Sequence, residues 1–320
     1  MNQKISGIHH ITAIASDPQR NLDFYTRILG LRLVKLTVNF DAPDTYHFYF
    51  GDEAGRPGTL LTFFPWPGAR RGLHGSGQVD WISFSIPDEA EAYWVDRLTQ
   101  HGLAVSPTEE RFGEMVIPFA DPDGLQLELV ASNETPPAMG WEAGPVPPDL
   151  AVIGIHGITM LEEGFEQSAG LLRDTFGFSQ STQSEKRIRF EAPSGEPGRR
   201  VDILTSPDIP DGRMGAGIVH HVAWRTPNDE DQLAWREQLV EQGLDVTPVL
   251  DRQYFHSIYF REPGGVLFEI ATDPPGFTLD EKIDCLGTSL KLPHWLEPKR
   301  DELVPLLPEL KLPLGCPEPA

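Results

Sequence analysis

The sequence predicts an α+β protein made of four tandem β-α-β-β-β modules. The first observation behind this prediction is an internal repeat, which is the sequence signature of a fold built from duplicated units. Three segments occur twice in the same order: GIHHITAI (from Gly7) returns as GIHGITML (from Gly154), GQVDWISFSIP (from Gly77) as GIVHHVAWRTP (from Gly217), and DPDGLQLELVAS (from Asp121) as EPGGVLFEIATD (from Glu262). The second observation is that every module opens with a strand pattern, continues as a helix pattern and closes with further strand patterns.

The repeat divides the chain into two homologous halves and a tail. Residues 1–135 form the N-terminal half and residues 150–275 the C-terminal half, with two modules each. Between them, residues 136–149 are rich in proline and glycine and are therefore expected to be a linker. Residues 276–320 are also rich in proline, but their apolar residues predict an ordered tail that packs on the rest of the fold.

The first module shows its elements most clearly. It opens with the strand IHHITAIA. The helix predicted over Pro18–Ile28 has Asp17 as its N-cap and Gly30 just past its end, which are residue types preferred at those positions. Three strands rich in β-forming residues are predicted to follow it, over Leu31–Val38, Tyr46–Phe50 and Leu60–Phe64.

The other three modules follow the same order of elements. In the second module, a strand over Trp81–Ile86 and a helix near Glu89–His101 precede two strands, over Met115–Phe119 and Leu125–Ala131. The third module covers about residues 152–205 and the fourth about residues 219–271. The repeat therefore accounts for nearly the whole chain outside the tail.

The composition excludes several classes of function. A formal net charge of -22 gives a surface that attracts neither nucleic acid nor an anionic membrane. The N-terminus lacks a basic segment followed by an apolar run, and no apolar run approaches the ~20 residues that cross a bilayer. The motifs HExxH, GxSxG, GxGxxG after a strand and the P-loop are absent, so the common hydrolase and nucleotide-binding functions have no support. We therefore expect a cytoplasmic protein that acts on a small molecule.

The layout and the motifs GIHHITAI, HHVAW and GGVLFEI resemble the vicinal oxygen chelate superfamily, the glyoxalase and extradiol dioxygenase group. The resemblance covers the four modules. It implies that pairs of modules form open barrels of eight strands, with a metal site inside the cup. The tail resembles that of the hydroquinone ring-cleaving branch of this superfamily, where it packs near the mouth of the pocket.

A comparison of the repeat copies indicates which residues could hold the metal. At the position of the first ligand, the first module has His10 and the third has Gly157; at the second, the fourth module has His221 and the second has Trp81. Both closing strands carry a glutamate, Glu128 in the N-terminal half and Glu269 in the C-terminal half.

One combination of modules, the first with the fourth, gives two histidines and a glutamate, namely His10, His221 and Glu269, whereas the other gives Gly157, Trp81 and Glu128, which cannot ligate a metal. Together with the superfamily resemblance, the first combination predicts one metal site per chain and requires the first module to face the fourth. Two histidines and one carboxylate leave open positions for non-haem Fe(II) and O2 chemistry. Ligand type alone also allows Mn(II).

Each predicted histidine ligand is the second residue of a His-His pair, His9-His10 or His220-His221. Adjacent side chains on a strand point to opposite faces, so only one histidine of each pair can face the metal directly. In the superfamily the ligand is the histidine just before the aliphatic residue, which implies His10 and His221. His9 and His220 are then polar neighbours of the ligands, and His156 matches His9, which favours a structural role at that position.

Further candidates lie on the first strand and in the segment DRQYFHSIYFREPGG. The resemblance to hydroquinone-cleaving enzymes implies that Arg252 and Tyr259 approach the substrate; the alternative is that Tyr259 is a core aromatic residue. Thr12 lies two residues beyond His10 and therefore on the same face of its strand. His256 could act as an acid or base, although alternation places it on the face opposite Tyr259.

These observations favour an Fe(II)-dependent dioxygenase that cleaves a substituted hydroquinone, with O2 and a small aromatic molecule as its partners. His220, Arg252 or Tyr259 would move protons and orient the ring. Three alternatives remain: a catechol extradiol dioxygenase, a glyoxalase-like isomerase or lyase, and a non-catalytic aromatic-binding protein. Glyoxalase-like sites commonly use four protein ligands, so a set of three favours O2 chemistry. The sequence leaves open whether the chain assembles as a homo-oligomer.

Overall fold

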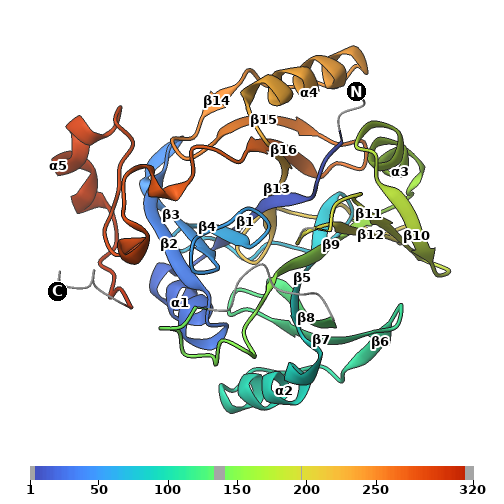
Figure 1. The fold of residues 1–320 in the computed structure, drawn as a ribbon, viewed down its shortest axis with the longest axis horizontal. Helices are drawn as coiled ribbons and strands as arrows, with labels where there is room; N and C mark the ends of the chain where they lie inside the picture. Colours follow the sequence, from blue (N-terminus) through green and yellow to red (C-terminus); the bar gives the residue numbers. More distant parts are fainter. Residues whose placement is uncertain (1–3, 133–140, 196, 314–320) are drawn as a thin grey trace.

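The computed structural model describes residues 4–132, 141–195 and 197–313, and it contains two curved eight-stranded sheets (Figure 1). Each sheet joins two modules of four strands, and short helices lie outside the strands. The predicted α+β architecture of four β-α-β-β-β modules is thereby confirmed. Within the predicted linker, residues 136–140 lie outside the described residues, so the prediction is untested over that stretch.

The first sheet combines the first and fourth modules, and its order is β14-β15-β16-β13-β1-β4-β3-β2. In Figure 1 the blue strands of the first module lie beside the orange strands of the fourth. The strands span Ile8–Ala15 (β1), Arg32–Asn39 (β2), Ala42–Gly51 (β3), Leu60–Pro65 (β4), Val219–Thr226 (β13), Leu250–Asp251 (β14), His256–Arg261 (β15) and Leu267–Thr272 (β16).

The second sheet combines the second and third modules in the order β10-β11-β12-β9-β5-β8-β7-β6. Each sheet therefore takes one module from each half, so the halves 1–135 and 150–275 mark the repeat and not the limits of the two sheets. The strands span Gln78–Pro87 (β5), Glu109–Arg111 (β6), Glu114–Ala120 (β7), Gln126–Ser132 (β8), Gly154–Glu162 (β9), Ser179–Gln183 (β10), Arg187–Glu191 (β11) and Arg200–Thr205 (β12).

The helices are short. The predicted helix over Pro18–Ile28 forms over its whole length, as α1 (Pro18–Asp23) followed by a π-helical turn over Phe24–Ile28. Asp17 caps it by accepting a hydrogen bond from the Arg20 amide at 2.9 Å, and Gly30 has the positive φ of a helix stop, +71°. The remaining α-helices are α2 (Glu91–Gln100), α3 (Glu166–Gly170), α4 (Asp229–Glu241) and α5 (Arg300–Leu303), and α3 continues as a π-helical turn over Leu171–Thr175. None of the described helices combines the length and the apolar character needed to cross a membrane.

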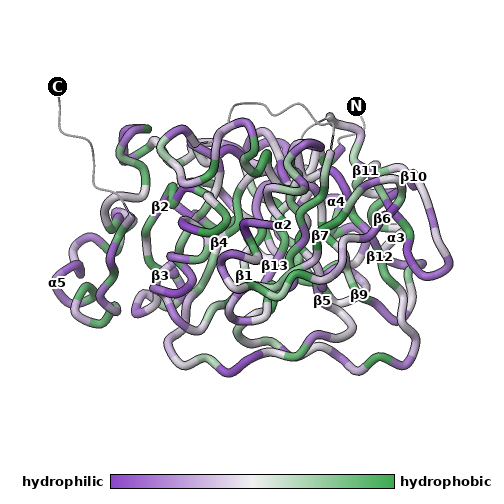
Figure 2. Tube along the Cα trace, turned by 90° about the horizontal axis from the view of Figure 1, so that it is seen from below, coloured by the Kyte–Doolittle hydropathy of each residue, from purple (hydrophilic) through white to green (hydrophobic). Residues whose placement is uncertain are grey.

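The C-terminal segment packs on the outer strands β2 and β3, and both views show α5 at that end of the molecule (Figures 1 and 2). Its anchor is Lys35, a fully buried lysine of β2. The Lys35 ammonium donates to the Phe277 carbonyl at 3.1 Å, to Asp280 at 2.6 Å and to Glu281. A second tie is the Tyr46 hydroxyl, which donates to the Pro308 carbonyl at 2.9 Å. Buried charge of this kind persists only when it is paired, so these contacts hold the segment on the sheet.

Candidate metal centre

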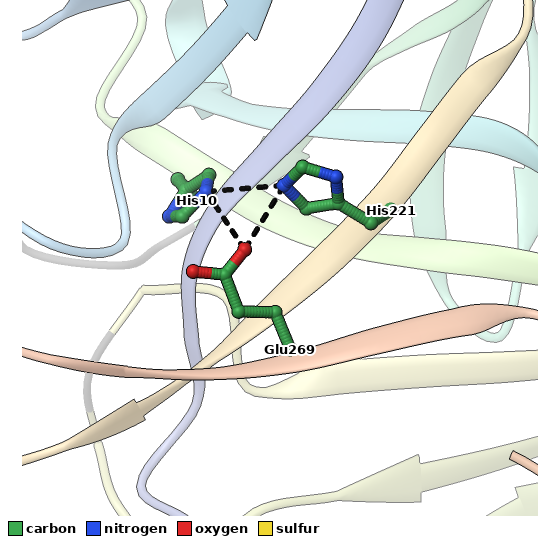
Figure 3. Close-up of side chains that lie close together, drawn as sticks. All are labelled: His10, His221 and Glu269. Atoms are coloured by element: carbon green, nitrogen blue, oxygen red, sulfur yellow. Dashed lines mark hydrogen bonds and ion pairs between the residues drawn. The ribbon is translucent and has the colours of Figure 1, made fainter. Parts of the chain in front are cut away.

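Three side chains converge in the first sheet: His10 from β1, His221 from β13 and Glu269 from β16 (Figure 3). The pairing of β1 with β13, and of β13 with β16, brings these strands side by side. The two Nε2 atoms are 3.4 Å apart. Glu269 Oε2 lies 3.5 Å from His10 Nε2 and 3.0 Å from His221 Nε2. All three residues are buried, so the chain has placed a carboxylate and two imidazoles together inside its core.

The donor set fits a divalent metal ion. Burial holds the pKa of His10 well below its usual range and lowers the pKa of His221 to about 3, so both imidazoles are neutral, the form that binds metals. Glu269 Oε2 makes no hydrogen bond, although the atom is fully enclosed. A buried carboxylate oxygen without a partner is costly unless a cation compensates it. Within the described part of the chain, this is the one trio of histidine and carboxylate groups with such spacing.

Each of these histidines is held by the histidine that precedes it. His9 Nδ1 lies 2.9 Å from His10 Nδ1, and His220 Nδ1 lies 2.8 Å from His221 Nδ1. Since Nε2 of His10 and of His221 faces the centre, the Nδ1 atom of each is free to carry the proton and donate to its neighbour. A hydrogen bond of this type fixes the tautomer and orientation of a metal-binding imidazole.

The carboxylate is oriented by a residue that the sequence analysis did not single out. Ser257 donates from Oγ to Glu269 Oε1 at 2.5 Å, which leaves Oε2 directed at the two imidazoles. Ser257 lies on β15 two residues before Tyr259 and therefore on the same face. Two features of the sequence could have identified Ser257: this spacing from Tyr259, and the valine at the matching position of the other copy, Val116.

A cavity of about 470 Å³ opens beside this trio. Its walls are mainly aromatic and come from both modules of the sheet. The lining residues are His10, Asn39, Phe40, Asp41, Ala42, His47, Tyr49, Phe64, Trp66, His220, His221, Thr247, Leu250, Arg252, Phe255, Tyr259 and Leu267. A concave, largely apolar site with a few convergent polar groups is the usual form of a small-molecule pocket.

Arg252 and Tyr259 both lie in the cavity wall. The Arg252 guanidinium stands over the Tyr259 ring at 5.4 Å, and its Nη1 lies 3.0 Å from Asp41 Oδ2. The Tyr259 ring is 5.6 Å from the His221 ring. Burial, and then the nearby Glu269, raise the pKa of the Tyr259 hydroxyl, so it stays protonated at neutral pH. Both residues are thus placed to contact a molecule bound next to the centre.

The remaining candidates from the sequence lie farther from the cavity. His9 packs against Phe255 at 5.1 Å and does not line the cavity. Thr12 also stands behind the wall; its hydroxyl lies 2.8 Å from that of Thr62, which is 2.9 Å from His47 Nε2. His47 does line the cavity, so Thr12 is connected to it through two hydrogen bonds.

His256 corrects an expectation. Its Nδ1 lies 2.6 Å from Asp229 Oδ1 at the start of α4, and its side chain is 36% exposed outside the cavity. The face opposite Tyr259 points toward the helix layer, so His256 cannot serve as an acid or base for a molecule in the cavity.

The sequence analysis also missed the wall that β3 and β4 supply. His47 and Tyr49 on β3 and Phe64 on β4 line the cavity, and Trp66 follows β4. His47 and Tyr49 are two residues apart on a strand of the module that carries His10, which is the signal that could have found them. The sequence analysis selected residues that only the fourth module had acquired, and the first module was therefore not considered.

The second sheet contains no comparable centre among its described residues. Its buried carboxylate, Glu128, is held by the Arg111 guanidinium, with Nη1 at 2.9 and 2.8 Å from the two oxygens, and by Ser83 Oγ at 2.9 Å. At Gly157 a side chain would meet the Arg200 carbonyl oxygen at 2.5 Å, so no histidine fits there. This copy of the site is closed by an ion pair.

Comparison with known proteins agrees with the fold. The family model described as "Glyoxalase/Bleomycin resistance protein/Dioxygenase superfamily" matches residues 7–129 and 154–270. The chain is 49% identical to "Putative ring-cleaving dioxygenase MhqO" of Bacillus subtilis (strain 168), over 95% of this chain and 96% of that protein. It is 34% identical to the "Chlorohydroquinone/hydroquinone 1,2-dioxygenase" of Sphingobium indicum, over 94% of this chain and 96% of that protein.

Solved structures give the same result. A crystal structure of a "putative dioxygenase" from Bacillus subtilis subsp. subtilis str. 168 superposes with a TM-score of 0.93 at 47% identity, covering 97% of this chain and 99% of that one. Glyoxalase I from Zea mays shares the fold at 13% identity, with a TM-score of 0.61 over 83% of this chain and 92% of that one. The chain belongs to the glyoxalase, bleomycin resistance protein and dioxygenase superfamily, as its repeated motifs predicted.

Proposed function

We propose that this protein is an Fe(II)-dependent dioxygenase that cleaves the ring of a substituted hydroquinone. The observation that carries the proposal is the convergence of His10, His221 and Glu269 at one side of an aromatic-walled cavity. Relatives that match nearly the whole chain are named as ring-cleaving dioxygenases, and one is named for chlorohydroquinone and hydroquinone. The fit of the donor set supports a metal ion, and the relatives support oxygen chemistry.

His10, His221 and Glu269 would hold the iron. These three protein groups would leave positions open on the ion for a phenolic oxygen and for O2, and the ion would supply the coupling between them. The chain's own contribution is to fix these three groups. His9 and His220 set the imidazole tautomers, and Ser257 fixes the carboxylate.

The cavity would orient the aromatic ring. Its volume of about 470 Å³ suits a single substituted ring, and Phe64, Trp66 and Phe255 offer apolar faces that exclude water. Arg252 stands close to Tyr259 in the same wall, where the two can donate hydrogen bonds to oxygen atoms of the substrate. In a hydroquinone the two hydroxyl groups are para. A ring bond at one hydroxylated carbon therefore cannot lead directly to the other hydroxylated carbon. Cleavage would therefore be of the extradiol type.

His220 is a residue we assign to orienting the substrate. It lines the cavity next to His221, and burial lowers its pKa to about 3, so its imidazole is neutral. Because its Nδ1 accepts the hydrogen bond from His221, the proton of this ring lies on Nε2, which can donate a hydrogen bond to a phenolic oxygen. Tyr259, which keeps its proton, and Arg252 can stabilise negative charge that develops on the ring oxygens.

The test is oxygen uptake by protein loaded anaerobically with Fe(II), or with Mn(II) in parallel, against a panel of hydroquinones and catechols. We expect uptake with hydroquinones that is lost in His221→Ala and retained in His256→Ala, a matched change of a histidine outside the cavity. Uptake with catechols alone would keep the iron centre and replace the substrate. Tight binding of the aromatic compound without oxygen uptake would favour a binding protein. Isomerisation of a glutathione adduct would favour a glyoxalase-like enzyme.

A further inference from the structure

Two buried carboxyl groups meet at the junction of the two sheets, outside the lining of the cavity beside the candidate metal centre. Glu162 ends β9 of the second sheet, and Glu262 follows β15 of the first sheet. Both residues are 2% exposed. Ser168 of α3 lies between them, with its Oγ 2.8 Å from Glu162 Oε2 and 2.7 Å from Glu262 Oε2.

The hydrogen bonds at this junction do not balance if both carboxyls are ionised. Ser168 has one hydroxyl hydrogen and can donate it to only one of them. Glu262 also accepts from the Gly264 and Val266 amides, each at 2.8 Å, whereas Glu162 Oε1 has no partner. No arginine, lysine or histidine of the described residues forms an ion pair with either group. Something positive, a proton or a cation, is needed between them.

In the other copy of the repeat, a half-exposed arginine pairs with a carboxylate at this junction. There Arg20 contacts Asp123 at 2.6 Å, and the Ser16 hydroxyl and amide donate to the same carboxylate at 2.5 and 2.8 Å. By sequence alignment of the repeats, Gln167 and Gly264 occupy the positions of Arg20 and Asp123, and Glu162 that of Ala15. The second copy has therefore lost this ion pair and gained a buried carboxyl group.

The junction opens into a pocket of about 470 Å³ that is lined by Glu162. Every charged residue in its lining is acidic: Glu162, Glu163, Glu166 and Asp211, with Ser76, Gln167 and Ser168 as neutral polar groups. At Gly264 a Cβ atom would lie 2.5 to 2.7 Å from the Glu162 carboxyl, so only glycine lets the turn approach this closely. The pocket thus combines closely packed backbone, an acidic rim and a buried oxygen without a partner.

We propose that this pocket is a second cation site, which takes a hard divalent ion of the calcium class between Glu162, Glu262 and the Ser168 hydroxyl. The donors are all oxygen atoms, which suit Ca²⁺ or Mg²⁺, whereas the two histidines of the other centre suit a transition metal. Water would complete the coordination shell from the open side. The ion balances the charge of the two carboxylates and ties the second sheet to the turn that follows β15.

The test is calorimetric titration of the full-length protein with CaCl2, paired with thermal unfolding. We expect one Ca²⁺ per chain and a higher Tm when it binds. Burial, and then Glu262, raise the pKa of Glu162 to about 8, so Ca²⁺ must displace a proton at neutral pH. Binding should therefore tighten as the pH rises to about 8, with Glu163, Glu166, Asp211 and Glu262 as the charged groups facing the ion.

Two variants remove the site without disturbing the fold. Glu162→Gln keeps the shape and the contact with Ser168, and Glu162→Ala restores the residue of the other copy; each should weaken Ca²⁺ binding by at least roughly tenfold. Glu163→Gln, at the exposed rim, is the matched control and should change it by less than about twofold.

Three results would overturn the proposal. The first is an absence of Ca²⁺ binding by the wild-type protein above about pH 8, which would mean that the pair holds only a proton. The second is binding by Glu162→Gln as tight as that of the wild type. The third is loss of Ca²⁺ binding in His221→Ala, which would place the ion at the candidate iron centre instead. Since the titration uses no substrate, its outcome is independent of the proposed dioxygenase activity.

Discussion

The two sheets each contain a buried glutamate at matching positions, Glu128 and Glu269, but the partners of the two carboxylates differ. In the second sheet Arg111 reaches Glu128 and closes the site with an ion pair. In the first sheet the arginine at the matching position, Arg252, is drawn away to Asp41 and the Tyr259 ring. Glu269 is then left with one serine and two neutral imidazoles. The same position is thus closed by an ion pair in one sheet and left open for the proposed metal ion in the other.

This difference teaches what the buried carboxylate requires. A charge in the core must be paired, and either an arginine or a metal ion meets that requirement. The ion pair makes the second sheet independent of any ligand, whereas under the proposed ligand assignment the first sheet takes an ion from solution for the same compensation. Substitutions of Glu128 and of Glu269 can therefore be compared to separate effects on stability from effects on function within one chain.

The largest effect should come from Glu269→Ala. Loss of one of three ligands should abolish iron binding and oxygen uptake, while the metal-free variant loses less stability than its counterpart in the other sheet, because no cation is left unpaired. Iron content and oxygen uptake check the first part, and denaturant unfolding the second. Retained iron and turnover would refute the assignment of Glu269 as a ligand.

Glu128→Ala is the mirror experiment. It leaves the mostly buried Arg111 guanidinium with the exposed Glu109 as its remaining carboxylate, which should cost roughly 3 kcal/mol in the free energy of unfolding. Iron content and kcat should remain at the wild-type level when the protein is assayed well below its Tm. A variant with normal stability but reduced iron would show that the two sheets are not separate in function.

A smaller effect is expected from Ser257→Val, which installs the residue type found at Val116 of the other copy. Glu269 Oε1 loses its hydrogen bond, so the carboxylate is less well oriented, and iron affinity should fall by about tenfold. A competition assay with a chelator measures the affinity. Ser257→Thr is the control, since it keeps the hydroxyl. Equal affinity in the valine variant would remove Ser257 from the support of the centre.

The smallest effect is a slope in stability with pH. Burial lowers the pKa of His9 to about 4, and of His220 and His221 to about 3, from an ordinary 6.5. The unfolded chain therefore binds more protons than the folded one below pH 6.5, and the stability of the metal-free protein should fall as the pH drops toward those values. Unfolding in guanidinium at pH 7 and at about pH 5 tests this. A stability that rises over this interval would contradict it.

Much of the fold followed from the repeat. Duplication marked the four modules, and the contrast of His10 with Gly157 and of His221 with Trp81 predicted which copies could meet around a metal. The pairing of β1 with β13 then agrees with the requirement that the first module face the fourth. The roles of the three ligands remain a proposal that the variants above test.

Other features depend on geometry that a residue pattern does not encode. Simple alternation separates neighbouring side chains, yet His9 touches His10 and His220 touches His221. The β1–β13 ladder shifts register between Ile8 and His10 and again between His221 and Val219, so His9 and His220 lie at the two irregularities, where simple alternation does not hold. The wall from β3 and β4 likewise became visible only when the sheet order placed those strands beside β1.

The pairing of the first module with the fourth has a consequence for the synthesis of the protein on the ribosome. His10 and His221 are 211 positions apart, so the ribosome makes the first ligand long before its partners emerge. Until β13 arrives, one edge of β1 has no neighbour to pair with, and an open strand edge invites association between chains. A fragment that ends before β16 would hold most of the protein's mass and still bind no iron. Under the proposed ligand assignment, synthesis must therefore be nearly complete before the nascent chain can bind the metal.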